Sequence, residues 1–148
     1  MKNGMLILLA LFFIVACDDD DNNNSNSKVT EVKNAAINGQ WQVTYFFDTD
    51  ETENFKDYVF EFGSDGTLTA TKGSTSVFGA WSVTDDGNDD NSKGDYDDID
   101  FNISFATPHD FEELTEDWEI IAMTSTKIEL RHVSGGGGGT DLLTFEKV

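Results

Sequence analysis

Basic side chains are scarce in this sequence. Its 148 residues include nine Lys and Arg against 29 Asp and Glu, which gives a formal net charge of −20 at pH 7. Nucleic acids and anionic membrane surfaces would repel a chain of this charge, so neither is an expected partner. The excess of carboxylates instead favours solubility and contact with cations.

Cysteine, histidine and proline are also rare. Cys17 is the only cysteine, so the chain cannot form an internal disulfide. His109 and His132 fall in different predicted elements, and the sequence has neither a Gly-x-Ser-x-Gly motif nor the spacing of a zinc site. We therefore expect a protein that is not an enzyme and that carries no cofactor.

No apolar stretch reaches the roughly 20 residues that a membrane-spanning helix needs. The longest one runs from Gly4 to Ala16, follows Lys2, and ends just before Cys17 and four aspartates. A positive start, a short apolar segment and a small final residue are typical of an export signal peptide. We predict a signal peptide over residues 1–16, whose removal leaves 132 residues, enough for one domain.

The residues that end this signal, Ile14-Val15-Ala16-Cys17, resemble the lipobox of bacterial lipoproteins. The resemblance implies that the peptide is cut before Cys17 and that this cysteine carries acyl chains such as palmitate. Several acyl chains anchor a protein firmly in a membrane, because each buried CH₂ contributes about 0.8 kcal/mol. The alternatives are an ordinary signal peptide with an incidental cysteine, and an uncleaved anchor.

Residues 18–30 are rich in Asp, Asn and Ser and lack an apolar pattern, which favours a disordered tether over residues 17–35. An acidic run directly after a lipidated cysteine resembles the export signal of certain Gram-negative lipoproteins. This resemblance implies an outer-membrane protein that faces the cell surface. The alternative is a protein retained on the periplasmic face.

From residue 36 onward, apolar and polar residues alternate in short runs between turn residues, which indicates half-buried strands. The clearest run extends from Ile99 to Phe105, and Asp65-Gly66 between two such runs indicates a hairpin. A long meander must curl to protect its edges, so we predict an all-β domain over residues 36–148, an eight-stranded antiparallel up-and-down barrel with almost no helix. The predicted strands are 41–48, 58–62, 67–71, 77–84, 99–105, 117–124, 127–133 and 142–148.

Gly39-Gln40-Trp41 at the head of the first strand resembles the Gly-x-Trp signature of the lipocalins. With four later motifs, it makes residues 37–148 similar to the lipocalin-like domains of secreted bacterial lipoproteins. The resemblance implies a barrel that binds a small apolar molecule. The later motifs are Tyr58-x-Phe60-x-Phe62, Gly79-x-Trp81-x-Val83, Phe111-x-x-Leu114-x-x-x-Trp118 and Leu143-x-Phe145-x-Lys147.

The inward-facing aromatic residues have two interpretations. They line a pocket for an apolar ligand, with Tyr45 or Tyr58 as a polar contact, or they fill the barrel and stabilise a domain that lacks disulfides. The residues concerned are Trp41, Tyr45, Tyr58, Phe60, Phe62, Trp81, Phe101, Phe105 and Trp118.

The acidic segment 85–98 is a candidate for a calcium site. Asp86, Asn88, Asp90 and Asp97 approach the ligand spacing of an EF-hand loop. However, Asn91 stands where that loop needs glycine, Asp97 replaces its bidentate glutamate, and strands flank the segment in place of helices. We therefore predict a solvated charged loop without a specific metal.

Two functions from different classes follow from these observations. The first is a carrier or sensor of a small apolar ligand at the outer membrane. The second is a non-catalytic structural or partner-binding lipoprotein, whose filled barrel is a scaffold and whose loops 85–98 and 134–141 form the contact surface. An open interior of a few hundred Å³ would favour the first function, and a packed interior the second.

Overall fold

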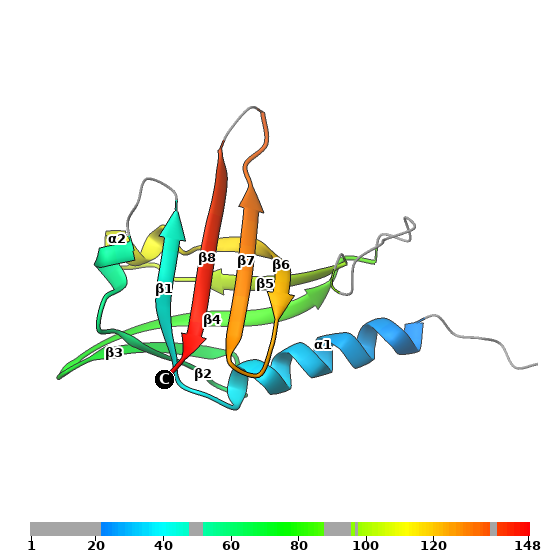
Figure 1. Cartoon of the computed structure of the whole chain (residues 1–148), viewed down its shortest axis with the longest axis horizontal. Coiled ribbons are helices and arrows are strands. Elements are labelled where there is room, and N and C mark those ends of the chain that lie inside the picture. Colours follow the sequence, from blue (N-terminus) through cyan, green and yellow to red (C-terminus); the bar gives the residue numbers. More distant parts are fainter. Residues whose placement is uncertain (1–21, 48–51, 88–95, 97, 137–138) are drawn as a thin grey trace, which may run out of the picture.

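The alternating segments form strands that run antiparallel in chain order and close into one barrel (Figure 1). Closure comes from β8 pairing with β1, from Trp41 opposite Lys147 to Phe47 opposite Leu142. The predicted eight-stranded antiparallel up-and-down barrel is therefore confirmed. The computed structural model describes residues 22–47, 52–87, 96, 98–136 and 139–148. In this part of the chain the strands are β1 (Trp41–Phe47), β2 (Val59–Phe62), β3 (Thr67–Lys72), β4 (Thr75–Asp85), β5 (Ile99–Ser104), β6 (Glu116–Met123), β7 (Lys127–Val133) and β8 (Thr140–Lys147).

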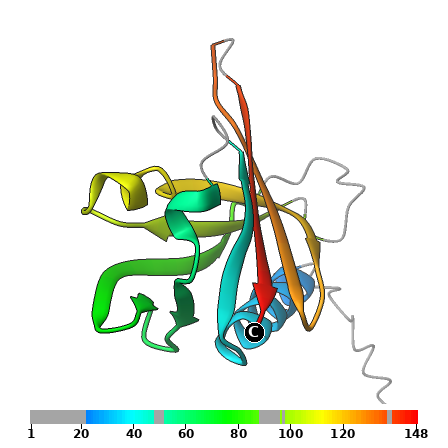
Figure 2. The same cartoon turned by 60° about the vertical axis from the view of Figure 1, so that its left-hand side comes forward.

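The barrel is flattened into two walls whose strands cross. Strands β1, β8 and β7 form the front wall, and β4 and β5 run across behind them (Figures 1 and 2). The inward residues of both walls belong to one continuous hydrophobic core. A domain of this size without disulfides depends on such a core for its stability.

A helix precedes the barrel where the sequence predicted a disordered tether. Helix α1 (Asn22–Ile37) includes residues 22–35 of that tether, so the prediction is wrong for this part. Val29, Val32 and Ala36 lie three and four residues apart, which places them on one face of a helix. Val32 and Ala36 are fully buried, mainly through packing against the barrel. Tertiary packing therefore stabilises a helix that its Asn- and Ser-rich sequence favours only weakly.

The two ends of the barrel are covered by different elements. Helix α1 lies at the end that holds the β2–β3 and β6–β7 turns (Figure 1). The opposite end holds η1 (Thr52–Phe55) in the β1–β2 connection and α2 (His109–Glu112) in the β5–β6 connection. Phe55 and Phe111 from these two short helices are both buried in the core.

A β-bulge changes which side of β1 faces inward. The register of β1 against β8 shifts between Val43 and Tyr45, because a bulge inserts one extra residue and reverses the alternation beyond it. Phe46 is consequently buried, whereas Tyr45 and Phe47 are 42% and 46% exposed. Strict alternation had placed Tyr45 in the interior, and that prediction is wrong.

The helices of the described residues are α1, η1 and α2. None of these helices combines the length and the apolar character that a membrane crossing requires. The predicted signal peptide and Cys17 lie outside the described residues, as do residues 18–21 of the predicted tether.

Candidate functional site

The barrel interior contains most of the residues that were predicted to line a pocket or fill a core. Tyr58 is half-buried at the rim, and Tyr45 lies on the outer surface. The remaining candidates are buried in the interior: Trp41, Phe60, Phe62, Trp81, Phe101, Phe105 and Trp118.

Phe111 occupies the centre of the end that α2 covers. Its ring centroid lies 5.4 Å from that of Phe55, 5.0 Å from Tyr58, 6.0 Å from Phe60 and 5.1 Å from Phe105. Edge-to-face and offset pairs at these separations are close-packed aromatic contacts. The α2 segment therefore places an aromatic side chain at the end of the barrel where a ligand would enter an open barrel.

Ring contacts continue from there to the other end of the barrel. Phe60 lies 5.3 Å from Phe145, and Phe145 lies 5.6 Å from Phe62. Phe62 in turn contacts Trp81 at 5.1 Å and Phe101 at 5.4 Å. An eight-stranded barrel is just wide enough to be filled in this way, so these residues form a packed core.

The core offers no polar group that could orient a ligand. Every buried residue of the described chain is apolar. Binding pockets for small molecules combine apolar walls with a few placed polar groups. Tyr45 was a candidate for that role, but it points outward.

The three tryptophans use their indole N–H groups to fix connecting segments. Trp41 Nε1 donates to the Ala36 carbonyl at 2.9 Å, and Trp118 Nε1 donates to the Leu114 carbonyl at 3.1 Å. Trp81 Nε1 donates to a carbonyl of the β2–β3 turn at 2.9 Å. Each indole satisfies its buried donor and joins a strand to the end of α1, the α2 segment or a turn.

Two threonine hydroxyls bond to the backbone at the end where α2 and η1 lie. Thr52 Oγ1 accepts from the Phe46 amide at 2.9 Å and donates to the Phe46 carbonyl at 3.1 Å. Thr115 Oγ1 makes the same pair of bonds with the amide and carbonyl of Phe105. A buried backbone needs such partners where strand pairing ends, so these hydroxyls have a structural role.

The candidate calcium loop lies mostly outside the described residues. Of its four candidate ligands, Asp86 is described, and its amide donates to the Asp98 carbonyl at 3.0 Å. Asn88, Asp90 and Asp97 lie outside the described residues. Within the described part of the chain, no three His, Cys, Asp or Glu side chains gather as a metal site would require.

The two histidines lie on different elements, as the sequence predicted. His109 is on α2, with its ring nitrogens 3.6 Å from Glu112 and 3.8 Å from Glu113. His132 is on β7, where Nε2 lies 3.5 Å from Glu116 and the ring meets Trp118 edge to face. Both histidines therefore have carboxylates as their nearest charged neighbours.

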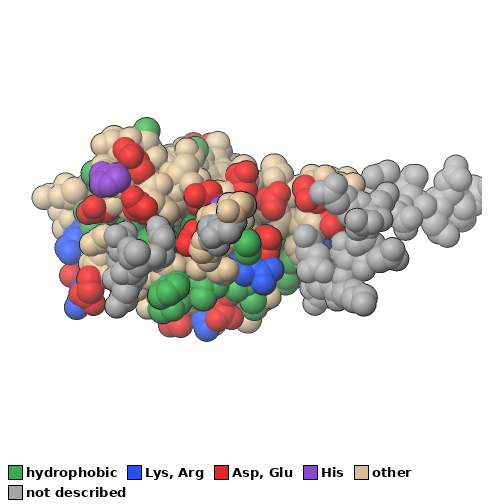
Figure 3. Space-filling model, turned by 90° about the horizontal axis from the view of Figure 1, so that it is seen from above, with side chains coloured by type: hydrophobic (Ala, Val, Ile, Leu, Met, Phe, Trp, Pro, Cys, Tyr) green, Lys and Arg blue, Asp and Glu red, His purple; other side chains and the backbone are tan. Residues whose placement is uncertain are grey.

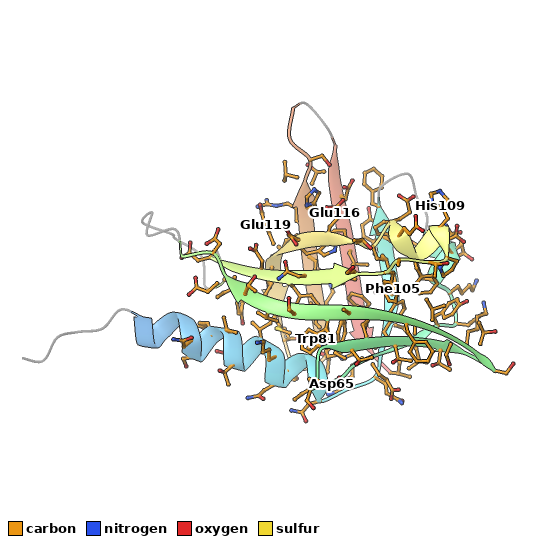
Figure 4. The ribbon with its side chains drawn as sticks, turned by 180° about the vertical axis from the view of Figure 1, so that it is seen from behind. Asp65, Trp81, Phe105, His109, Glu116 and Glu119 are labelled. Atoms are coloured by element: carbon orange, nitrogen blue, oxygen red, sulfur yellow. The ribbon has the colours of Figure 1, made fainter. Side chains whose placement is uncertain are left out.

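Among the grooves that described residues form on the outer surface, two are considered for ligand binding. One, with a volume of about 530 Å³, crosses β4, β5 and β6 over small polar side chains such as Ser82 and Ser104. The other, of about 470 Å³, lies between α1 and the rim of the barrel. Figure 4 shows Asp65 and Trp81 of this second groove beside the C-terminal end of α1.

A small apolar patch also lies on the outer wall. The rings of Tyr45 and Phe47 are parallel within 5°, with centroids 6.4 Å apart. In the view from above, apolar side chains gather at the front edge, and charged side chains lie beside them and over the rest of this face (Figure 3).

Comparison of the chain with family models, with curated proteins and with solved structures finds no match. The resemblance to lipocalins therefore rests on the sequence motifs and on the barrel. The barrel is consistent with a lipocalin-like fold.

Acidic side chains crowd the outer face of β5 and β6. Burial raises the pKa of Asp100 above its usual range, and the charges of Asp86, Asp117 and Glu119 raise it further. Asp100 pairs directly with Glu119 across the two strands. Like charges placed opposite each other destabilise a sheet, so this face carries an electrostatic cost.

Several residues of the core were missed as interior candidates. Phe46 is absent from the interior candidates, because strict alternation with Trp41 and Tyr45 places it on the outer face and the bulge in β1 has no sequence signal. Phe55 and Phe111 lie in connections, where strand alternation gives no information. Phe145 is buried and belongs to the motif Leu143-x-Phe145-x-Lys147. Its spacing of two residues from Leu143 was a sufficient signal to place it in the barrel interior.

Proposed function

We propose that this chain is an exported lipoprotein, anchored through Cys17 in the outer membrane with its domain at the cell surface. We further propose that its barrel is a non-catalytic scaffold that contacts partners through its outer surface. The observation that carries the scaffold role is the continuous aromatic packing of the interior around Phe111 and Phe62. An apolar ligand would have to displace these rings to enter.

The charge of the domain supports the need for a covalent anchor. Removal of residues 1–16 takes away one lysine and brings the formal net charge to −21. A domain of this charge is repelled by anionic lipid surfaces, so it cannot attach to them electrostatically. Acyl chains on Cys17 would supply the attachment that the surface of the protein cannot.

The anchor can be tested by fractionation and mass measurement. The full-length chain is produced in a Gram-negative host beside the Cys17→Ser variant, and membranes are washed with carbonate. We expect the parent protein to stay in the membrane fraction, with a mass that corresponds to cleavage before Cys17 plus acyl chains, and the variant to be released. Retention of the variant after the wash would favour an uncleaved anchor. Protease treatment of intact cells tests exposure, because a protein on the periplasmic face would be protected.

The scaffold role can be tested by native mass spectrometry of the mature lipoprotein released from detergent micelles. We expect the mass of the acylated protein alone, because the rings in the interior leave no room for a guest. A co-purifying small apolar molecule would instead support the carrier function that the lipocalin resemblance implies.

A further inference from the structure

The groove between α1 and the barrel rim has walls from two parts of the chain that are distant in sequence. One wall is a single face of α1, and the other is the β2–β3 turn with the adjoining part of β4 (Figure 4). The groove has a volume of about 470 Å³, within the range of small-molecule sites. Its lining includes Lys33, Asn34, Ile37, Ser64, Asp65 and Trp81.

The wall formed by the turn is held rigidly. The Gly63 amide donates to the Thr67 carbonyl at 2.7 Å, and Asp65 Oδ1 accepts from the Thr67 amide at 3.0 Å. Gly66 has a φ of 88°, which glycine adopts without strain. Trp81 bonds to both ends of the turn, through its indole N–H to Gly63 and its amide to Gly66. The Asp65 carboxylate therefore has a fixed position at the groove.

The helical wall is fixed as well. Val32 and Ala36 are fully buried on the face of α1 that packs against the barrel. The Ala36 carbonyl accepts the indole N–H of Trp41 at 2.9 Å. Because both contacts are close to Lys33 and Ile37 in sequence, the backbone of these two residues is held at the groove.

The groove carries one charge of each sign. Among the lysines and arginines that the structure describes, Lys33 is the one without a carboxylate, carbonyl or aromatic partner. The Thr67 amide lowers the pKa of Asp65 below its usual range, so this carboxylate is ionised at neutral pH. Lys33 and Asp65 line the same groove and form no ion pair with each other, so neither charge is neutralised by the other.

The groove also has apolar lining residues. Ile37 is half-buried at the groove, and Trp81 is 7% exposed. Asn34 and Ser64 line the same groove with an amide and a hydroxyl that can form hydrogen bonds. The groove therefore combines an apolar surface with a cation, an anion and neutral hydrogen-bonding groups.

We propose that this groove binds a short peptide with free termini. The peptide carboxylate lies at Lys33, its ammonium at Asp65, and its apolar side chains on Ile37 and Trp81. A simple anion would use Lys33 alone and would be repelled by the net charge of −20. A simple cation would leave Lys33 unpaired. Each residue of an extended peptide spans about 3.3–3.6 Å, so a di- or tripeptide holds its two charges apart, as charges on opposite walls require.

Calorimetric titration of the full-length protein in detergent micelles tests this proposal. The probe is Leu-Leu with free termini, and the matched control ligand is N-acetyl-Leu-Leu-amide, which has the same side chains without the two charges. The variants are Lys33→Gln and Asp65→Asn, because asparagine keeps an acceptor for the Thr67 amide. Lys56→Gln is the matched control, since it removes the same charge near Lys72, at the other end of the β2–β3 hairpin.

We expect saturable binding of Leu-Leu and at least a tenfold loss in each groove variant, because hydrogen bonds to charged groups contribute about 1.5–3 kcal/mol. Lys56→Gln should bind as the parent does, and the blocked peptide should not bind. The proposal is overturned by an absence of saturable binding, by equal affinity in Lys33→Gln and the parent, or by binding that depends on Lys33 but not on Asp65. The last result would identify a site for simple anions.

Discussion

Gly79 gives Phe105 its place in the core. A Cβ atom at Gly79 would lie 2.6 Å from the Phe105 ring and 2.5 Å from the Ser104 carbonyl oxygen. Both contacts are too short for any side chain, and a backbone carbonyl cannot move aside cheaply. The Phe105 ring therefore occupies the space that a side chain at Gly79 on β4 would need.

We predict that Gly79→Ala lowers the free energy of unfolding by about 1–3 kcal/mol, the range for overpacked cores. Gly135→Ala is the control, because nothing lies within 4 Å of a Cβ at that position and its backbone is unstrained. Urea denaturation of both variants measures the difference. Equal urea midpoints for the two variants would contradict this prediction, because they would mean that the Phe105 ring moves aside at no cost in stability.

Folding raises the pKa of Asp100, whereas an ion pair lowers the pKa of a carboxylate. The two cases therefore change stability with pH in opposite directions. Burial raises the pKa of Asp100 in the folded state, and Asp86, Asp117 and Glu119 raise it further. Between the ordinary carboxyl pKa and this raised value, the folded protein binds more protons than the unfolded chain. The contribution of Asp100 to stability therefore falls as pH rises through that window.

Asp100→Asn should consequently raise the melting temperature at pH 7 and leave it nearly unchanged below the ordinary carboxyl pKa, about 3.9. Melting curves from pH 3.5 to 8 measure both effects. Asp110→Asn on α2 removes the same charge from an exposed position outside this cluster. If that control stabilises the protein equally, general charge reduction explains the gain and the crowding at Asp100 does not.

At the scale of elements, sequence patterns predicted strands better than helices. Each strand shows the alternation that half-buried strands require, and the Asp65-Gly66 turn joins β2 to β3 as expected. Helix α1 gave a weak signal, because its few apolar residues follow a stretch rich in Asn and Ser. The groove beside α1 was not predictable, since it brings this helix against a turn thirty residues away.

We predict that Val32→Asp undocks α1 and leaves the barrel folded. Val32 is fully buried, and an unpaired carboxylate in an apolar contact costs several kcal/mol. Hydrogen exchange should show lost protection in α1 and retained protection in β7 and β8. Asn34→Asp introduces the same charge at an exposed position of the helix and should keep α1 protected. Loss of protection in both variants would indicate a helix held by charge balance instead of by packing.

At the scale of the whole molecule, the net charge of −20 opposes compact folding through self-repulsion. Salt screens such repulsion, and the Debye length falls from about 10 Å at 0.1 M to about 3 Å at 1 M. We therefore predict that the melting temperature rises between 0.1 M and 1 M NaCl. A decrease would mean that ion pairs such as Lys127 with Glu129 contribute more than the repulsion costs.

Phe111 belongs to the aromatic packing that fills the barrel. Phe111 contacts Phe55, Tyr58, Phe60 and Phe105, so Phe111→Ala should leave an apolar cavity among the remaining rings. Substitutions of this kind cost about 3–5 kcal/mol, against a total of about 5–15 kcal/mol for a natural domain. We therefore expect a marked loss of stability in urea.

Such a cavity stays dry and accepts small apolar guests such as benzene. Benzene should therefore stabilise Phe111→Ala against urea and leave the parent protein unchanged. Phe111→Leu provides a milder variant if the alanine variant does not fold, and His109→Ala on the exposed side of α2 should behave as the parent. Equal stabilisation of the parent by benzene would mean that its interior is already open. The carrier function would then explain the barrel better than the scaffold role does.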